Sequence, residues 1–486
     1  MPLPSIHLIL ITFFISFFAN WQFAYQITYI NTAYDVIKEE AGYGKINNLF
    51  IKNSLNNNNK EWSIWWGLIV SSFYPGSIIG FILVPFLISK FGTRLSFFYS
   101  TIPALTGCLI QIIPIFINFF QYFDRKNLPI FLVIGRFVIG LQSGCSLSLL
   151  PLFINEISFK SETTFLSTFQ QISQALSTMI GLIIGSNYIL PIKYEYKYLI
   201  CQVAAIIPTI IFSIFIVFAP NTPMFIMKKS NNLKSLEKSF LFYRGSTFQL
   251  IENKYLLTGK ISEEKRDTQL INDKNKLSAV KGFIIGFFAS ISYTFTGDDI
   301  IDSYSSNIII TAFPNIKKSL LDITAIFFSF LLFISSIFGS LIINKIGIRN
   351  ALIYGLIGTA ISNFFVFLGN VTEFFLLTVL SLSMTKIFIG IGAGGPAWFL
   401  MSKLIPPEMR NFSQAFSIGC ILITTGICTY LYPILNTYLK FYTFIVLSTI
   451  PSTLISIILY LFLPELKNNT YHEVEYILKN KFFSGI

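Results

Sequence analysis

Five ionisable side chains lie inside segments that are otherwise apolar enough to cross a membrane. They are Arg136, Asp298, Asp299, Asp302 and Lys386. An ionised group at the bilayer centre costs roughly 2.5–3.5 kcal/mol on insertion scales, so each should face a partner or a water-filled cavity. Ion pairing, or the binding of a proton or cation, is the chemistry that such groups can do.

Asp298 and Asp302 are four residues apart, which places them on the same side of one helix. We hypothesise an ion pair between Lys386 and Asp299 or Asp302. Two alternatives stay open. Either the three acids lie above the membrane surface in an outer loop, or one unpaired Asp binds a proton or cation that is coupled to transport.

Polar and small residues recur every three or four positions in three of the apolar segments. The stripes are Ser167, Gln171, Gln174, Thr178, Gly181 and Gly185; Ser290, Thr294, Asp298, Asp302 and Ser305; and Lys386, Gly390, Gly394 and Trp398. Unsatisfied polar groups cannot face acyl chains. The stripes should therefore face one another as interhelical hydrogen bonds, or line a path for a solute.

The elements that must position these residues are membrane spans. The chain has 486 residues, of which 53% are hydrophobic and only 12% charged, and this is typical of an all-α membrane protein. A spanning helix needs about twenty mostly apolar residues. We predict twelve spans, at 7–30, 64–86, 95–119, 129–153, 164–187, 196–219, 282–309, 323–343, 351–369, 375–402, 413–434 and 441–463.

The longest hydrophilic stretch separates six spans from six. It carries twelve Lys or Arg against six acids, and the sequence LISKFGTR at 87–94 before it resembles LIINKIGIR at 341–349 after it. We predict two six-helix repeats joined by a helical linker and followed by a tail. The boundaries are 1–219, 220–281, 282–463 and 464–486.

The linker should begin with a short amphipathic helix over 233–243, ended by Gly245. The even number of spans puts both termini on the side of the linker. In the fourth span, Gly140 and Gly144 form a spacing that is typical of close helix contact.

Composition and residue inventory exclude several function classes. The net charge of +12 could suggest a nucleic-acid partner, but the excess is mostly in the linker. The chain has only two histidines, His7 and His472, both near span ends. No nucleophile–base pair or set of metal ligands is apparent, so we expect no enzyme activity, no metal and no cofactor.

Four short motifs occur in a characteristic order and spacing. They are FAYQITYIN at 23–31, GRF at 135–137 with Gly140, PLFINEIS at 151–158 and LPELKNNTYHEV at 463–474. Together they resemble the sugar porters of the major facilitator superfamily, most closely the animal facilitative glucose transporters, across essentially the whole chain. The resemblance implies two helical repeats that rock around a midplane site and move a hexose or related polyol by alternating access.

The resemblance also implies a sugar pocket. Gln171 and Trp398 match its residues, as a partner for hydroxyls and as an apolar wall. Other pocket positions carry Tyr293 and Thr294 (usually Gln and Gln), Asp299 (Asn), Leu332 (Asn), Gly390 (Glu) and Thr425 (Asn), so glucose is not implied as the substrate. The candidate substrate-binding residues are Gln171, Gln174, Tyr293, Thr294, Asp299, Trp398 and Thr425; the candidate hinge in the tenth span is Gly394, Gly395 and Pro396.

The family closes its cytoplasmic side with a charged latch that holds the outward-facing state. Arg94, Glu156, Arg349, Arg410 and Glu465 occupy matching positions and are our candidate gating residues. Other latch positions are changed, with Ser89, Thr163, Asn221, Met224 and Lys403 in place of charged residues of the family or, at Ser89, of an acid or Asn. We therefore expect a weaker latch and a bias toward inward-facing states.

Three functions follow from the resemblance and the charges. Facilitative transport is the first, because Gln26 stands where proton-coupled sugar porters carry Asp. The second is uptake coupled to a proton or cation, or transport of a cationic solute, using Asp298, Asp299 or Asp302. The third is a sensor that binds solute without moving it.

The expected partners are a small solute and the lipid bilayer. The expected location is the cell membrane, with both termini and 220–281 in the cytoplasm.

Overall fold

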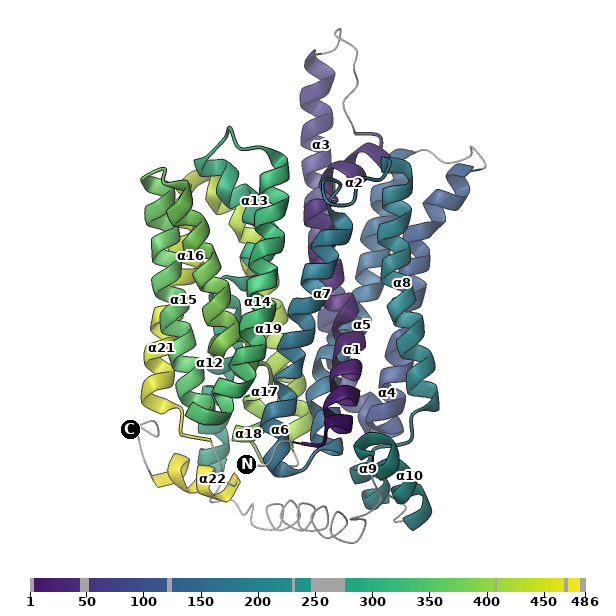
Figure 1. The fold of residues 1–486 in the computed structure, drawn as a ribbon, viewed down its shortest axis with the longest axis vertical. Helices are drawn as coiled ribbons and strands as arrows, with labels where there is room; N and C mark the ends of the chain where they lie inside the picture. Colours follow the sequence, from purple (N-terminus) through teal and green to yellow (C-terminus); the bar gives the residue numbers. More distant parts are fainter. Residues whose placement is uncertain are drawn as a thin grey trace.

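The computed structural model describes residues 4–43, 52–119, 125–229, 232–245, 276–406, 409–466 and 471–480, and within them it is helical without strands. Two groups of long helices stand side by side (Figure 1). Helices of the first half of the sequence make up one group and those of the second half make up the other.

The helices are bounded as follows. The first group contains α1 (Ile6–Thr32), α2 (Tyr34–Glu40), α3 (Lys52–Ser71), α4 (Phe73–Phe119), α5 (Leu128–Ile157), α6 (Lys160–Ser167), α7 (Phe169–Gly185) and α8 (Tyr194–Phe218), followed by α9 (Pro223–Lys229) and α10 (Leu233–Arg244). The second group contains α12 (Lys276–Phe295), α13 (Asp298–Ala312), α14 (Lys318–Ile346), α15 (Ile348–Val371), α16 (Phe375–Phe388), α17 (Gly394–Phe399), α18 (Met401–Leu404), α19 (Arg410–Leu439), α20 (Tyr442–Phe444) and α21 (Ile450–Phe462), followed by α22 (Tyr471–Asn480).

Ten helical segments of the described chain are long and apolar enough to cross a membrane. One of them, Ile64–Ile115, has 52 residues and contains two predicted spans. The backbone between these two spans is non-helical at Gly92 (φ 79°). The predicted span 164–187 is absent from the ten because α6 and α7, with 8 and 17 residues, are separate helices. The twelve predicted spans therefore all have helical counterparts, and the all-α fold is confirmed.

The predicted seventh and tenth spans are less regular than expected. The seventh is broken: α12 ends at Phe295, Gly297 adopts the left-handed conformation with φ 89°, and α13 starts at Asp298. Glycine takes this conformation without the steric cost that a Cβ imposes. The tenth span runs through α16, a π-helical turn over Ile389–Ala393, and α17. Such turns are frequent at functional sites.

Small residues bring α4 and α5 into backbone contact. A Cβ added to Gly144 would lie 1.9 Å from the carbonyl oxygen of Ser77, and one added to Gly140 would lie 2.3 Å from that of Phe73. The spacing of Gly140 and Gly144 thus marks a helix contact, as predicted.

Helices α9, α10 and α22 lie at one end of the bundle, which is also where α1 begins (Figure 1). We call this end the linker side, and the end with α2, α3 and α13 the far side. The predicted amphipathic helix is confirmed as α10, with Gly245 in the left-handed conformation at its end. It buries Leu236, Ser239, Phe240 and Tyr243. The rest of the predicted linker, 246–275, lies outside the described residues.

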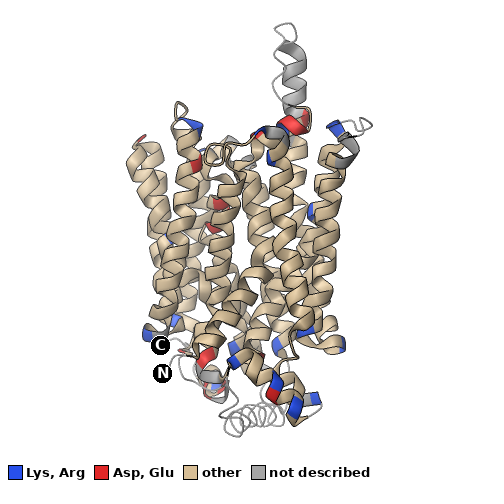
Figure 2. Cartoon of the chain, turned by 45° about the vertical axis from the view of Figure 1, so that its right-hand side comes forward, with Lys and Arg blue, Asp and Glu red and all other residues tan. Residues whose placement is uncertain are grey.

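Charged residues gather at the two ends of the bundle, and the length between them is almost entirely uncharged (Figure 2). Large apolar side chains such as Ile214 and Leu454 point outward from α8 and α21 with more than half of their surface exposed. An apolar outer face suits contact with acyl chains.

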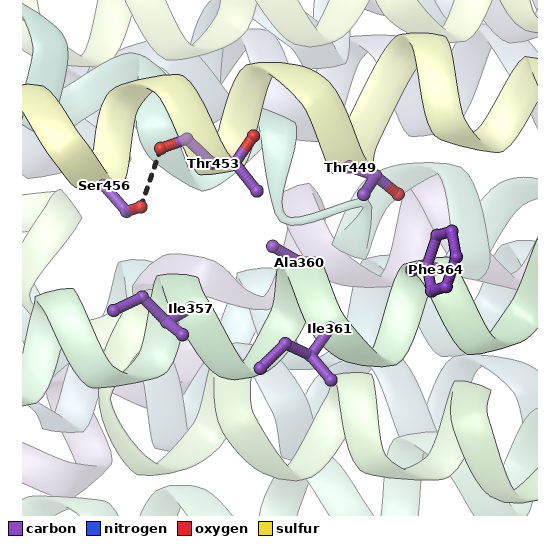
Figure 3. A pocket seen from close by; sticks show the side chains of 7 residues that line it. All are labelled: Ile357, Ala360, Ile361, Phe364, Thr449, Thr453 and Ser456. Atoms are coloured by element: carbon purple, nitrogen blue, oxygen red, sulfur yellow. Dashed lines mark hydrogen bonds between the residues drawn. The ribbon is translucent and has the colours of Figure 1, made fainter.

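A groove of about 320 Å³ runs between α15 and α21 (Figure 3). Its lining includes Ile357, Ile361 and Phe364, and the hydroxyl groups of Thr449, Thr453 and Ser456 lie along the opposite helix. The hydroxyl of Ser456 donates to the backbone of Thr453. None of the predicted solute-binding residues lines this groove.

Candidate functional site

The seven candidate substrate-binding residues lie between the two helix groups. Gln171 and Gln174 come from α7, Tyr293 and Thr294 from α12, Asp299 from α13, Trp398 from α17 and Thr425 from α19. Each is buried, with at most 4% of its surface exposed. The three polar stripes predicted from the sequence do face the interior of the bundle.

Gln171 and Trp398 meet across the boundary between the helix groups. The indole Nε1 of Trp398 donates to Oε1 of Gln171 at 3.0 Å, and Gln414 donates to the Trp398 carbonyl at 2.7 Å. The ring of Tyr293 packs against the indole with a centroid separation of 4.7 Å. Nε2 of Gln171 and Oε1 of Gln174 are buried without a hydrogen-bond partner in the structure. A buried amide atom of this kind can bond a hydroxyl of a solute.

A hydrogen-bonded chain crosses the same boundary. Nε2 of Gln174 donates to the Tyr293 hydroxyl at 3.0 Å, and this hydroxyl donates to Oδ2 of Asp298 at 2.6 Å. The amide on α7 is thereby connected to the carboxylate that begins α13.

Lys386 lies between two carboxylates. Its Nζ is 2.5 Å from Oδ1 of Asp298 and 2.5 Å from Oδ1 of Asp302, and all three side chains are at least nine-tenths buried. The hypothesised pair with Asp302 is confirmed, and the acids lie inside the bundle rather than above it. The alternative pair with Asp299 is wrong, because i,i+4 spacing directs Asp298 and Asp302 to one face while Asp299 faces α19.

Asp299 has a hydroxyl partner instead. Oγ1 of Thr425 donates to its Oδ2 at 3.0 Å, and Thr425 also contacts the hydroxyl of Thr294 at 2.9 Å. The carboxylate is 4% exposed. A buried carboxylate beside hydroxyls can accept hydrogen bonds from a polyol or attract a cation.

Arg136 is a buried cation whose hydrogen-bond partners are uncharged. It donates to the carbonyl oxygens of Ile69 and Gln26, both at 2.7 Å, and to Oε1 of Gln26 at 3.4 Å. Its guanidinium lies 5.7 Å from the centre of the Phe73 ring. The side chain opposite this arginine is therefore an amide that cannot take up a proton near neutral pH.

The candidate gating residues of the first helix group lie together on the linker side. Arg94 donates to the carbonyl of Ile216 at 3.0 Å and to Oδ1 of Asn221 at 3.4 Å. Oε2 of Glu156 accepts from the hydroxyls of Thr93 and Thr222, at 2.6 and 2.5 Å. Asn221, at a position where the resemblance implies an acid, thus still accepts a hydrogen bond from Arg94, but it carries no opposite charge.

The candidate gating arginines of the second group also donate to backbone carbonyls. Arg349 donates to the carbonyl of Tyr460 at 2.8 Å and stacks over its ring. Glu465 lies against Gly347, whose added Cβ would be 2.8 Å from its Oε1. Arg410 donates to the carbonyl of Ser402 at 3.2 Å.

One altered latch position, Lys403, contacts the other helix group. Lys403 donates to Oγ1 of Thr164, which joins α18 to α6 across the two helix groups on the linker side. Glu162 on α6 forms a bidentate ion pair with Arg244 of α10, at 2.8 and 2.9 Å. The far side is bridged as well, because Asn31 donates to the carbonyl of Asp302 at 2.8 Å and Lys318 pairs with Asp35 at 2.6 Å. The two helix groups are therefore joined by described contacts on both sides of the site.

The candidate hinge follows the π-helical turn. Gly394 packs on the Gln171 amide, 2.8 Å from where its Cβ would be, whereas a Cβ on Gly395 would meet nothing closer than 3.7 Å. Gly390 lies against α14, since its Cβ would be 2.0 Å from Oγ of Ser335. Leu332 packs with Ala175 and Ile389, so α14 presents an apolar wall here.

The sequence analysis missed three polar residues of the site. Asn31 contacts α13, Gln414 supports Trp398, and Asn363 donates to the carbonyl of Thr296 at 2.8 Å beside the helix break. A lone amide in an apolar span was the indication available for Asn363.

Comparisons with known proteins agree with this geometry. The profile described as "Sugar (and other) transporter" matches residues 11–478. The facilitated glucose transporter member 3 of Mus musculus is 22% identical over 96% of this chain and 92% of its own length. The glucose transporter GlcP of Staphylococcus epidermidis is 24% identical over 85% and 89%. The structure of the proton:xylose symporter XylE bound to 6-bromo-6-deoxy-D-glucose superposes with a TM-score of 0.76 at 16% identity, covering 97% and 99% of the two chains.

Proposed function

Because this chain belongs to the sugar (and other) transporter family, we propose that it carries a hexose or related small polyol across the cell membrane by facilitative alternating access. The moving units are the helices of 1–219 and 282–463, and the linker side with both termini faces the cytoplasm. The relatives named as glucose transporters support this substrate class.

The observation that carries the proposal is the contact between Gln171 and Trp398. The two side chains come from different helix groups and meet where the groups contact each other. A pyranose can stack on the indole and bond the free amide atoms of Gln171 and Gln174. Tyr293 and Thr425 supply further hydroxyls, and the acceptor Asp299 suits a solute rich in hydroxyl donors.

Facilitative rather than proton-coupled movement is supported by the partner of Arg136. That guanidinium bonds Gln26, whose amide does not titrate, so this pair cannot exchange a proton during transport.

A second candidate is movement coupled to a proton or cation, or transport of a cationic solute. The arrangement that favours it is Asp299, a buried carboxylate bonded by a hydroxyl while Lys386 pairs with the other two acids. A transporter-like sensor that binds solute without flux is the third candidate, and the altered latch positions favour it.

The test is uptake of a panel of labelled hexoses, pentoses and polyols into proteoliposomes. We expect saturable uptake of at least one hexose, reduced about fivefold or more in Gln171→Ala, because one lost hydrogen bond to a buried polar group is worth about 1–3 kcal/mol. Ser71→Ala, a partly exposed position outside the site, is the control. Saturable binding without flux in the parent would favour the sensor instead.

A further inference from the structure

The break between α12 and α13 is held by neighbouring residues of α16. Thr385 donates to Oδ1 of Asn363 at 2.9 Å, and Nδ2 of Asn363 donates to the carbonyl of Thr296 just before the break. Lys386, the next residue in the chain, contacts the first turns of α13. It pairs with the carboxylates of Asp298 and Asp302 and donates to the carbonyl of Asp298 at 3.3 Å. The end of α16 thus contacts the chain after the break directly, through Lys386, and the chain before the break through Asn363 of α15.

Two contacts between the helix groups end on the same ammonium. In the first, Gln174 of α7 bonds Tyr293, which bonds Asp298, which pairs with Lys386. The second passes through Asp302. Its carbonyl accepts from Asn31 of α1, and its carboxylate pairs with Lys386. The Lys386 side chain is therefore the last member of both contacts, the one that starts at Gln174 and the one that starts at Asn31.

We propose that Lys386 is a positioning residue, an internal latch that holds α13 closed against α1 for as long as its two ion pairs persist. Because the three charges are buried, separating α13 from α16 would leave uncompensated charge inside the bundle, which is strongly unfavourable. Opening on the far side by a movement of α13 away from α16 consequently requires the two pairs to rearrange together. Loss of the Gln174–Tyr293 contact on solute binding would loosen one of them and so connect occupancy with opening.

The latch rests on alternating access but not on the identity of the solute, so it can be tested without solute. The test is thiol labelling in lipid nanodiscs, in a chain whose native cysteines are replaced. Ser305→Cys reports on α13, because Ser305 is 2% exposed. Asn315→Cys, in the exposed segment after α13, is the labelling control.

Three variants are compared in that background. Lys386→Met removes the charge, Lys386→Arg keeps it, and the triple variant Lys386→Met, Asp298→Asn, Asp302→Asn removes all three charges while retaining an acceptor for Tyr293. The latch predicts that a membrane-impermeant maleimide labels Ser305→Cys about fivefold faster or more in Lys386→Met and in the triple variant, and within about twofold of the parent in Lys386→Arg. Labelling of Asn315→Cys should not change.

The triple variant separates positioning from charge balance. If the pairs serve only to neutralise buried charge, the triple variant will melt near the parent temperature and label as slowly as the parent, and the latch is overturned. It is also overturned if Lys386→Met folds and labels slowly. If Lys386→Met does not fold, the triple variant decides alone. Failure of hexose uptake in the parent would count against the proposed substrate and leave these labelling rates as the measure of the latch.

Discussion

The indole of Trp398 donates a 3.0 Å hydrogen bond to the side-chain carbonyl of Gln171, and the two residues belong to different helix groups. Both are buried, and the other amide atom of Gln171 has no partner within the structure. A solute that enters this contact can replace the indole as a partner of the glutamine. In the proposed function, this contact therefore both joins the helix groups at the site and presents groups that can bind a polyol.

Removing only the donor of Trp398 should change affinity more than turnover. Trp398→Phe keeps an aromatic wall but loses the indole N–H, so the empty closed form is weakened while stacking on the solute persists. We expect KM for uptake to shift by less than about tenfold, and Trp398→Ala, which also loses the wall, to reduce kcat/KM by about tenfold or more. Equal kinetics in Trp398→Ala and the parent would contradict the assigned role of the indole.

Close packing of α4 on α5 should make Gly144 intolerant of a larger side chain. A valine there would press on the Ser77 carbonyl, and we expect a loss of roughly 1–3 kcal/mol in unfolding free energy. Gly67→Val is the matched control, because nothing lies within 4 Å of an added Cβ. Thermal melting in detergent measures both, and equal melting temperatures for the two variants would be incompatible with the packing.

The ion pair between Glu162 and Arg244 should fix α10 to the first helix group. Both side chains are only 10% exposed, and the guanidinium also stacks 3.8 Å from the centre of the Phe159 ring. We expect Arg244→Met to lose roughly 1.5–3 kcal/mol of local stability and to exchange the amide hydrogens of α10 about tenfold faster. Lys234→Met, at an exposed position of the same helix, should leave exchange unchanged. Unaltered protection in Arg244→Met would mean that apolar contacts alone hold α10.

Lys403 should give the closed linker side a dependence on pH. Burial, and then repulsion by Arg410, lower the pKa of Lys403 to about 8. A base whose pKa is lower in the folded state destabilises that state fully below the folded pKa, and the cost disappears as pH rises toward the unfolded value of about 10.4. The melting temperature of the parent should therefore rise relative to that of Lys403→Gln between about pH 7.5 and 9.5. A difference that is flat or falls with pH would contradict the altered pKa.

The helices were predictable because their determinants are local. Long apolar runs, the basic linker and Gly245 fixed the spans and α10 without reference to tertiary structure. The break at Gly297 was harder to predict, because its stabilising partners Asn363 and Thr385 come from other spans.

The partners of the buried charges could also be predicted only in part, because they too come from other spans. Spacing alone placed Asp298 and Asp302 on one face, but the predicted partner of Lys386 was Asp299 or Asp302, and the pair with Asp298 was not predicted. Choosing between Asp299 and Asp302 required the direction in which α13 starts after the break, and that direction is set by packing against α16 and α19. In the same way, Lys403 looked like a lost latch residue in the sequence, whereas the structure gives it a contact with Thr164.

The central claim is facilitative movement of a hexose through the site between Gln171 and Trp398. Its most direct test is the steady-state ratio of labelled hexose inside and outside proteoliposomes under an imposed proton gradient, in the parent and in Asp299→Asn. We predict a ratio of about 1 for both proteins, since a facilitator equilibrates its solute and Gln26 cannot carry a proton. Accumulation well above 1 in the parent that is lost in Asp299→Asn would contradict it and assign the coupling to Asp299.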